Sequence, residues 1–76
     1  MKDISNEQIF VKVVESGSFK GAAELLNIDP SLISRRVANL EKKLNVKLME
    51  RSTKQSIPTE QGHIYFQGLK KLLEEQ

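Results

Sequence analysis

The chain of 76 residues contains no cysteine, and this absence excludes disulfide bonds, thiolate metal sites and cysteine nucleophiles. Its single histidine, His63, has no suitably spaced carboxylates with which to form a metal site and no nucleophile partner. There is no glycine-rich phosphate loop, because Gly17 and Gly21 separate helical segments without a preceding strand. We therefore expect no catalytic residues, no metal and no cofactor, and the chain is not expected to be an enzyme.

Long apolar runs are also absent, since none approaches the roughly 18 residues that a membrane span requires. The first residues, Met1 to Asn6, are polar and differ from a secretory signal. A length of 76 residues allows one domain with a simple core, and a hydrophobic content of 38% excludes a disordered polyelectrolyte. These features predict a small soluble module in the cytoplasm, with no membrane partner.

The charge is unevenly distributed along the chain. Twelve Lys and Arg against ten Asp and Glu give a net charge of only +2, but residues 1–29 carry −2, residues 30–57 carry +5 and residues 58–76 carry −1. The basic stripe of the middle segment consists of Arg35, Arg36, Lys42, Lys43, Lys47, Arg51 and Lys54. Such clustering is typical of a surface that binds a polyanion, but charge alone does not distinguish this from an ordinary solvated helix face.

Two short helices are predicted in the first third of the chain. Ser5 and Gln8 have the spacing of a capping box, apolar residues then recur at helical spacing, and Gly17 ends the segment. Ser18 is an N-cap type for a second helix that ends at Leu26. Within that helix a pair of alanines would allow two helix axes to approach closely.

A third helix is predicted from Pro30 to about Leu44, because Asp29 is a favoured N-cap and proline suits the first helical position. With the second helix it forms a helix-turn-helix pattern over about residues 18–38. Its core-facing stripe would consist of Ile33, Val37, Leu40 and Leu44. Its opposite side, with small polar residues and an arginine near the N-terminus, suits a major groove, although an ordinary amphipathic helix fits the same wheel.

The period of apolar residues changes after Asn45. Val46, Leu48 and Met49 predict a short strand and residues 56–58 a second one, with the polar, basic residues 51–55 as the turn between them. A two-stranded ribbon after a helix-turn-helix is a wing, whose basic tip usually meets phosphates or the minor groove. Thr59 can cap a last helix whose apolar face is broader than a core of this size is expected to cover.

Taken together, the chain resembles the N-terminal DNA-binding domain of LysR-type bacterial transcriptional regulators from Ile4 to Leu73. The motifs that carry the resemblance are Phe10-x-x-Val13, Glu15-Ser16-Gly17-Ser18-Phe19, Ala22-Ala23-Glu24-x-Leu26, Leu32-Ile33-Ser34-Arg35, Leu40-Glu41-x-x-Leu44, Val46-x-Leu48-Met49-Glu50-Arg51 and Thr59-Glu60-x-Gly62. The resemblance implies a mainly α, winged helix-turn-helix fold with a three-helix core, a short two-stranded wing and a long C-terminal linker helix. The division would be a DNA-binding domain over 1–59 and a linker or dimerisation helix over 60–76.

This chain departs from the family pattern at four places. Asn45 replaces a usual glycine but tolerates the left-handed conformation that this turn would need. Met49 replaces a usual phenylalanine, and Pro58 stands where leucine is common. The recognition helix begins with Asp29-Pro30-Ser31 where the family often has Ser-Gln-Pro or Ser-Gln-Ser, so a frequent base-reading glutamine is missing.

Site residues follow from the resemblance by position. It implies that base-facing residues in the major groove are Pro30, Ser31, Leu32, Ser34 and Arg35, and that phosphate or wing contacts come from Ser18, Lys20, Arg36, Arg51 and Lys54. The last helix would pair two subunits through Tyr65, Leu69, Leu72 and Leu73. The partners implied are double-stranded promoter DNA and a second copy of the chain, with a tetramer as a further option in a full-length protein. A small-molecule effector is expected only through a C-terminal domain that these 76 residues do not contain.

The sequence therefore predicts a LysR-type regulator that binds double-stranded DNA as a dimer, with recognition helix 30–44 in the major groove and wing 51–56 on the backbone or minor groove. The alternative is a winged-helix module that binds another protein through its last helix. Under that alternative Leu69→Asp and Leu72→Asp would abolish function, whereas Arg35 and Lys54 would be dispensable.

Overall fold

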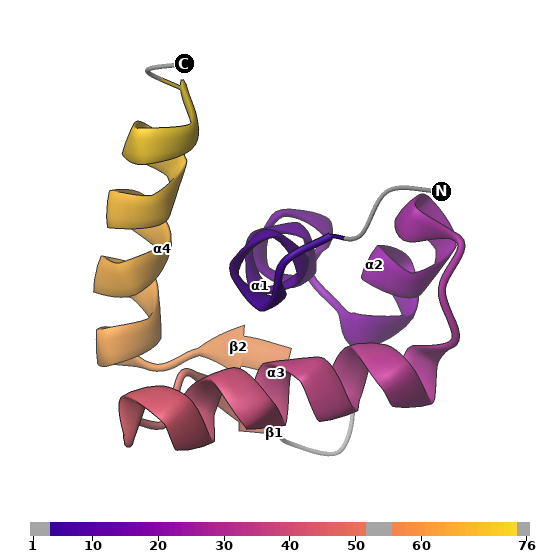
Figure 1. Cartoon of the computed structure of the whole chain (residues 1–76), viewed down its shortest axis with the longest axis horizontal. Coiled ribbons are helices and arrows are strands. Elements are labelled where there is room, and N and C mark those ends of the chain that lie inside the picture. Colours follow the sequence, from indigo (N-terminus) through magenta and orange to yellow (C-terminus); the bar gives the residue numbers. More distant parts are fainter. Residues whose placement is uncertain (1–3, 52–55, 75–76) are drawn as a thin grey trace.

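The computed structural model describes residues 4–51 and 56–74, and it confirms the expected mainly helical, winged helix-turn-helix fold (Figure 1). In chain order the elements of the described residues are α1 (Asn6–Ser16), α2 (Phe19–Leu26), α3 (Pro30–Leu44), β1 (Met49–Arg51), β2 (Ser56–Pro58) and α4 (Glu60–Glu74). Among these described residues, no helix has the length and apolarity needed to cross a membrane.

Helices α1 and α2 begin and end where the local sequence signals place them. The Ser5 Oγ accepts a hydrogen bond from the Gln8 backbone N–H at 3.1 Å, and the Ser5 N–H donates to the Gln8 side chain at 3.0 Å. Gly17 ends α1 with a φ of 84°, a left-handed conformation that glycine adopts without strain. Ser18 caps α2 by accepting from the Gly21 N–H at 2.8 Å. Both caps satisfy backbone donors that a helix start would otherwise leave unpaired.

Helix α3 has the predicted bounds. Asp29 is its N-cap and Pro30 its first residue. Asn45 ends it with a φ of 55°, so asparagine adopts the left-handed conformation expected at this position. The left-handed residue Asn27 ends α2 in the same way, which turns the chain sharply before α3.

The core lies where α1, α2 and α3 meet. Three residues of the predicted α3 stripe, Ile33, Val37 and Leu40, are fully buried, whereas Leu44 is half-buried at its end. The buried residues packed with them are Ile9, Phe10, Val13, Ala22, Ala23, Leu48 and Met49. This cluster buries the apolar side of α3, and the opposite side of the helix therefore faces solvent.

The two strands form an antiparallel ribbon in which Met49 pairs with Pro58, Glu50 with Ile57 and Arg51 with Ser56. The second strand has the predicted bounds, but the prediction that Val46 and Leu48 belong to the first strand was wrong. The Leu48 N–H donates to the Glu41 side chain at 2.8 Å, and the Leu48 carbonyl accepts from the Thr59 N–H at 2.9 Å. The Thr59 bond continues the register of the ribbon by one position, but the Leu48 N–H is used by Glu41 and the Thr59 carbonyl accepts from the His63 N–H of α4, so the reciprocal ladder bond is not formed and the strand starts only at Met49.

Helix α4 packs against α1 with part of its apolar face. The rings of Tyr65 and Phe10 have centroids 5.8 Å apart, and Phe66 and Leu69 are half-buried against the core. Burial, together with the nearby Glu7 carboxylate, raises the pKa of Tyr65 above its ordinary value of 10.0. In Figure 1 the C-terminal end of α4 projects away from α3.

Two glycines of α4 have opposite surroundings. A Cβ added at Gly62 would lie 2.0 Å from the Leu48 carbonyl oxygen, a backbone atom that other hydrogen bonds hold in place. A Cβ added at Gly68 would meet no atom within 4 Å. Gly62 therefore permits the close approach of α4 to the segment before β1, whereas no contact of this kind accounts for Gly68.

We predict that Gly62→Ala and Gly68→Ala change stability in opposite directions. The new methyl group at Gly62 should lower the free energy of unfolding by about 1–3 kcal/mol, the usual range for overpacking. At Gly68 the better helix propensity of alanine should raise it by up to about 1 kcal/mol. Urea unfolding followed by circular dichroism at one protein concentration measures both changes. Equal effects of the two substitutions would contradict the packing described for Gly62.

Candidate nucleic-acid interface

The solvent face of α3 carries most of the residues that the sequence places in the major groove. Pro30, Ser31 and Arg35 are exposed, whereas Leu32 and Ser34 are half-buried at the margins of that face. The exposed residues lie in the N-terminal half of the helix, where small side chains and a proline leave space in front of the arginine. This half of α3 is therefore open to a large partner.

The first turn of α3 contains the N-cap bond expected of Asp29 and a side-chain bond that the sequence did not predict. The Ser31 hydroxyl donates to Asp29 Oδ1 at 2.7 Å, and the Ser31 backbone N–H donates to the same atom at 2.8 Å. These two bonds hold the pKa of the Asp29 carboxyl below its ordinary value of 3.8, and the side-chain bond has the larger effect. Because its proton points to Asp29, the Ser31 hydroxyl presents acceptor lone pairs to any partner.

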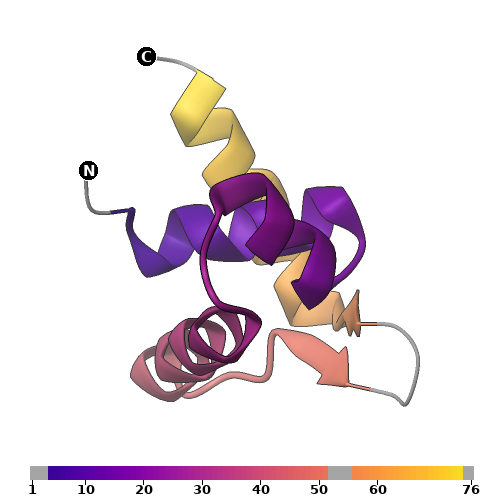
Figure 2. The same cartoon turned by 90° about the vertical axis from the view of Figure 1, so that its right-hand side faces the viewer.

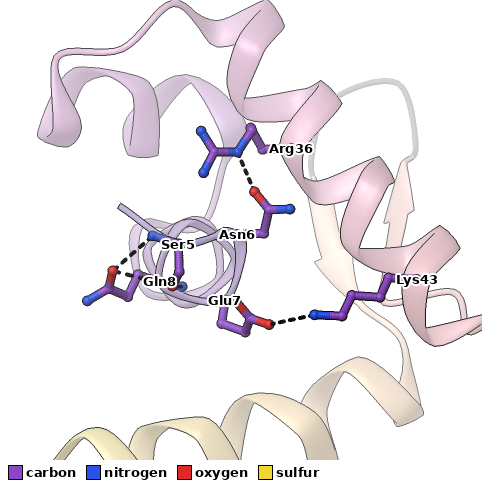
Figure 3. Close-up of polar contacts among 6 residues, drawn as sticks. All are labelled: Ser5, Asn6, Glu7, Gln8, Arg36 and Lys43. Carbon is purple, nitrogen blue, oxygen red and sulfur yellow. Dashed lines mark hydrogen bonds and ion pairs between the residues drawn. The ribbon is translucent and has the colours of Figure 1, made fainter. Parts of the chain in front are cut away.

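Two residues of the basic stripe point toward α1 and away from the exposed face. Arg36 donates from Nε to Asn6 Oδ1, and Lys43 Nζ lies 4.0 Å from Glu7 Oε2 (Figure 3). Arg36 also donates from Nη2 to the Ile4 carbonyl. These contacts fasten the start of α1 along the side of α3. The family resemblance predicts that Arg36 contacts a phosphate. In the structure its guanidinium bonds to Asn6 of α1 and to the Ile4 carbonyl, and the phosphate contact stays a prediction.

The remaining described cations of the stripe whose side chains can be placed are exposed: Arg35 and Lys42 on α3, and Lys47 in the segment before β1. Figures 1 and 2 both show the ribbon lying beside α3 on the same side of the molecule. Arg51 ends β1, whereas Lys54 lies outside the described residues. The exposed positive charge of the described stripe thus lies along α3 and in the segment before β1.

The start of α2 holds the other two expected phosphate contacts. Lys20 is exposed, and Ser18 is half-buried with its oxygen accepting from Gly21. The Ser18 hydroxyl hydrogen is not used in that cap bond, so the residue keeps a donor. Its role on a phosphate stays a prediction.

A junction around Leu48 is the feature that sequence reasoning missed. Glu41 Oε2 on α3 accepts from the N–H groups of both Leu48 and Met49, at 2.8 and 3.0 Å. From the other side, Thr59 Oγ1 donates to the Lys47 carbonyl at 2.6 Å and accepts from the Gly62 N–H at 2.9 Å. The signal was present in the motifs that contain Glu41, Thr59 and Gly62, but their spacing along the chain does not reveal that they meet.

The four residues expected at a dimer interface divide into two pairs. Tyr65 and Leu69 are half-buried against their own core, whereas Leu72 and Leu73 are exposed, Leu72 at 64%. Ile64, an apolar residue of the last helix that was not among those expected to pair two subunits, is also 64% exposed and lies eight residues before Leu72. Beside Ile64 is a largely apolar hollow of about 330 Å³ lined by Leu44, Val46, Leu48, Gln61, Ile64 and Tyr65.

Within residues 4–51 and 56–74, no three His, Cys, Asp or Glu side chains are grouped in a way that could hold a metal ion. The N-terminal half of α3 offers hydrogen bonding from Ser31 and Arg35 and apolar contact from Pro30 and Leu32.

We predict that the pKa of Asp29 depends on the Ser31 hydroxyl. Because the folded value lies below the ordinary 3.8, the Asp29 carboxylate stabilises the start of α3 above that pH, and this contribution is lost as the pH falls through the folded pKa. In Ser31→Ala the pKa should rise toward 3.8, although the backbone bond remains. An NMR titration of the Asp29 side-chain carboxyl carbon measures both values, and an unchanged pKa in the variant would contradict the assignment.

The sequence matches a family model described as "Bacterial regulatory helix-turn-helix protein, lysR family" over residues 5–63. The chain is 45% identical over 75 residues to the HTH-type transcriptional activator AaeR of Escherichia coli strain K12, covering 99% of this chain and 24% of the relative. It is 49% identical over 76 residues to the HTH-type transcriptional regulator CrgA of Neisseria meningitidis, covering 99% of this chain and 25% of that relative. The chain thus spans about a quarter of the length of these curated relatives.

Solved structures of similar fold include a complex of the BenM DNA-binding domain with benA site 1 DNA. That chain has a TM-score of 0.87 and 38% sequence identity, with 92% of this chain and 79% of that chain covered. Full-length CbnR complexed with its target DNA has a TM-score of 0.85 and 32% identity, with 91% of this chain and 24% of that chain covered. The family model covers most of the sequence, and the arrangement of helices and ribbon agrees with these structures. The chain therefore belongs to the LysR family of bacterial regulatory helix-turn-helix proteins.

Proposed function

We propose that the chain binds double-stranded DNA in a sequence-specific manner and is the DNA-binding part of a longer transcriptional regulator. The observation that carries this proposal is the exposed N-terminal half of α3, together with the ribbon that lies beside the C-terminal half of the same helix in Figure 1. The BenM domain, whose fold is similar, is described in a complex with DNA. A helix of this kind fits the major groove, and a wing beside it reaches the backbone or minor groove. The site of action would then be the bacterial cytoplasm, where promoter DNA is found.

Base readout is assigned to the first turns of α3. Arg35 is exposed and can donate two parallel hydrogen bonds to the O6 and N7 atoms of a guanine. Ser31, whose proton is engaged by Asp29, would accept from the amino group of a cytosine or an adenine. Pro30 and Leu32 would supply apolar contact, for example to a thymine methyl group, and Ser34 would lie at the edge of the interface.

Phosphate contacts would position α3 in the groove without contributing directly to sequence specificity. Ser18 and Lys20 at the start of α2 are assigned to one side of the groove, and Arg51 and Lys54 of the wing to the other. Arg36 would contribute less to phosphate binding, because its guanidinium already bonds to Asn6 of α1 and to the Ile4 carbonyl. Each lysine or arginine that neutralises a phosphate should add about one unit to the slope of log affinity against log salt concentration.

We predict that Arg35→Ala lowers affinity for a selected DNA site and removes discrimination at one base pair, by about 1–3 kcal/mol. Lys71→Ala is the matched control, because Lys71 is an exposed cation on α4 and does not belong to the proposed DNA-binding surface. Fluorescence polarisation on duplexes selected from random DNA, at several salt concentrations, measures affinity, discrimination and salt slope. Unchanged affinity in Arg35→Ala, or binding that is insensitive to salt, would overturn the proposal.

We also propose that the domain acts as a homodimer joined through α4. Ile64 and Leu72 are exposed large apolar residues on this helix, and exposed apolar surface of this kind commonly marks an interface. Two copies related by a twofold axis would place their recognition helices in successive major grooves about 34–36 Å apart. Tetramers, and response to a small effector, would depend on the part of the regulator that lies beyond these residues.

For the dimer, we predict that Leu72→Asp shifts the population to monomers, because the interface would have to bury an unpaired carboxylate. Leu25→Asp is a matched control, since Leu25 is 67% exposed against 64% for Leu72 but lies on α2. Sedimentation equilibrium over a range of concentrations gives the dissociation constant of each variant. If the wild-type chain has a mass of only 8.6 kDa at the highest concentrations, the dimer proposal fails.

A further inference from the structure

The backbone of Leu48 joins the recognition helix to the start of α4. Its N–H donates to the side chain of Glu41 on α3, and its carbonyl accepts from the N–H of Thr59, the residue before α4. Leu48 is itself almost completely buried, at 1% exposure. One peptide segment is thus held by α3 on one side and by the start of α4 on the other.

Three further contacts tighten this junction. Glu41 Oε2 accepts a second bond from Met49 N–H, and Thr59 Oγ1 donates to the Lys47 carbonyl. Thr59 Oγ1 also accepts from the Gly62 N–H, which fixes the first turn of α4. At Gly62 the helix approaches Leu48 so closely that no side chain fits between them. We refer to Glu41, Leu48, Thr59 and Gly62 as the clasp.

The carboxylate of Glu41 makes the hydrogen bonds of the clasp stronger than bonds between neutral groups would be. A hydrogen bond to an ionised carboxylate is shorter and stronger than one between neutral groups. Both donors belong to buried residues, so without Glu41 two backbone N–H groups would lose their acceptor in the protein interior. The clasp therefore resists a change in the position of α4 relative to the C-terminal half of α3.

We propose that Glu41 and Thr59 are positioning residues that set the distance between the two recognition helices of the dimer, and hence the half-site spacing that the protein accepts. This inference rests on the proposed function, since it requires DNA binding by α3 and pairing through α4. Neither residue reads DNA. They act by holding the peptide segment at Leu48 between α3 and α4. This fixes the position of the recognition helix relative to the helix that pairs the subunits.

The test compares two pairs of variants. Glu41→Ala removes the acceptor, whereas Glu41→Gln keeps a carbonyl oxygen that can accept both bonds less strongly. Thr59→Val removes the hydroxyl at nearly constant shape, whereas Thr59→Ser keeps it. Glu24→Ala, which removes an exposed carboxylate of α2, controls for the change in net charge near DNA.

Each variant is measured on three duplexes built from a half-site selected by the wild-type chain: one half-site, two at the selected spacing, and two separated by about five additional base pairs, half a helical turn. For the wild type, the wrong spacing should weaken binding about tenfold or more, because the second half-site can no longer be reached without strain. In Glu41→Ala and Thr59→Val this penalty should fall below about threefold, while affinity for one half-site stays within about threefold of wild type. Glu41→Gln, Thr59→Ser and Glu24→Ala should keep the penalty.

Hydrogen exchange at the amides of Leu48 and Met49 reports on the clasp without DNA, and it should accelerate in Glu41→Ala. A general loss of stability would weaken binding to all three duplexes, and this outcome in both Glu41→Ala and Thr59→Val would overturn the inference. An unchanged spacing penalty in these variants would overturn it as well, although the proposed function would stand. Failure of the wild-type chain to bind any selected half-site would instead overturn the proposed function itself.

Discussion

Burial of one stripe of α3 is the constraint on which the rest of the molecule depends. Ile33, Val37 and Leu40 are completely buried, so the helix cannot rotate about its axis without exposing apolar side chains to water. That fixed rotation turns Ser31 and Arg35 outward. A helix can serve as a rigid reading element only if its opposite face is held in this way, and here the holding face is provided mainly by α1 and α2.

The polar contacts of α3 divide along its length. Near the middle of the helix Arg36 bonds to Asn6 and Ile4, which fastens the helix to α1. One turn further on, Glu41 bonds to the segment before β1. The N-terminal half keeps an open surface, whereas the following turns carry the contacts that position it. The proposed recognition and positioning roles thus belong to different parts of one helix.

Helix α4 has more apolar residues than the core of one chain covers. Tyr65, Phe66 and Leu69 cover part of the core, while Ile64 and Leu72 remain exposed on another side. The apolar positions are too many for one face, which is why the composition of this segment already suggested a partner. Which residues are left for that partner follows from the direction in which α4 crosses α1, a property of the packed molecule.

Much of this protein could be predicted from local sequence. The capping box at Ser5, the left-handed ends at Gly17 and Asn45, and the Asp29-Pro30 start of α3 are signals that act within a few residues. They set the ends of α1, α2 and α3, whereas the stability of such short helices comes mainly from packing. The ordered motifs likewise identified the family.

What only the tertiary structure decided involves residues far apart in the chain. The sequence placed Arg36 and Lys43 in one basic stripe, but in the fold the Arg36 guanidinium bonds to Asn6 and Ile4, while Lys43 lies 4.0 Å from Glu7 and keeps a side chain that is 72% exposed. Strand β1 starts later than its residue types predict because the Leu48 N–H bonds to the Glu41 side chain on α3 in place of a strand partner. Periodicity and propensity describe neighbours along the chain, whereas these contacts depend on the angles at which packed helices meet. The sequence by itself therefore determined the elements and the family, and packing decided which of its charged and apolar residues remain available to a partner.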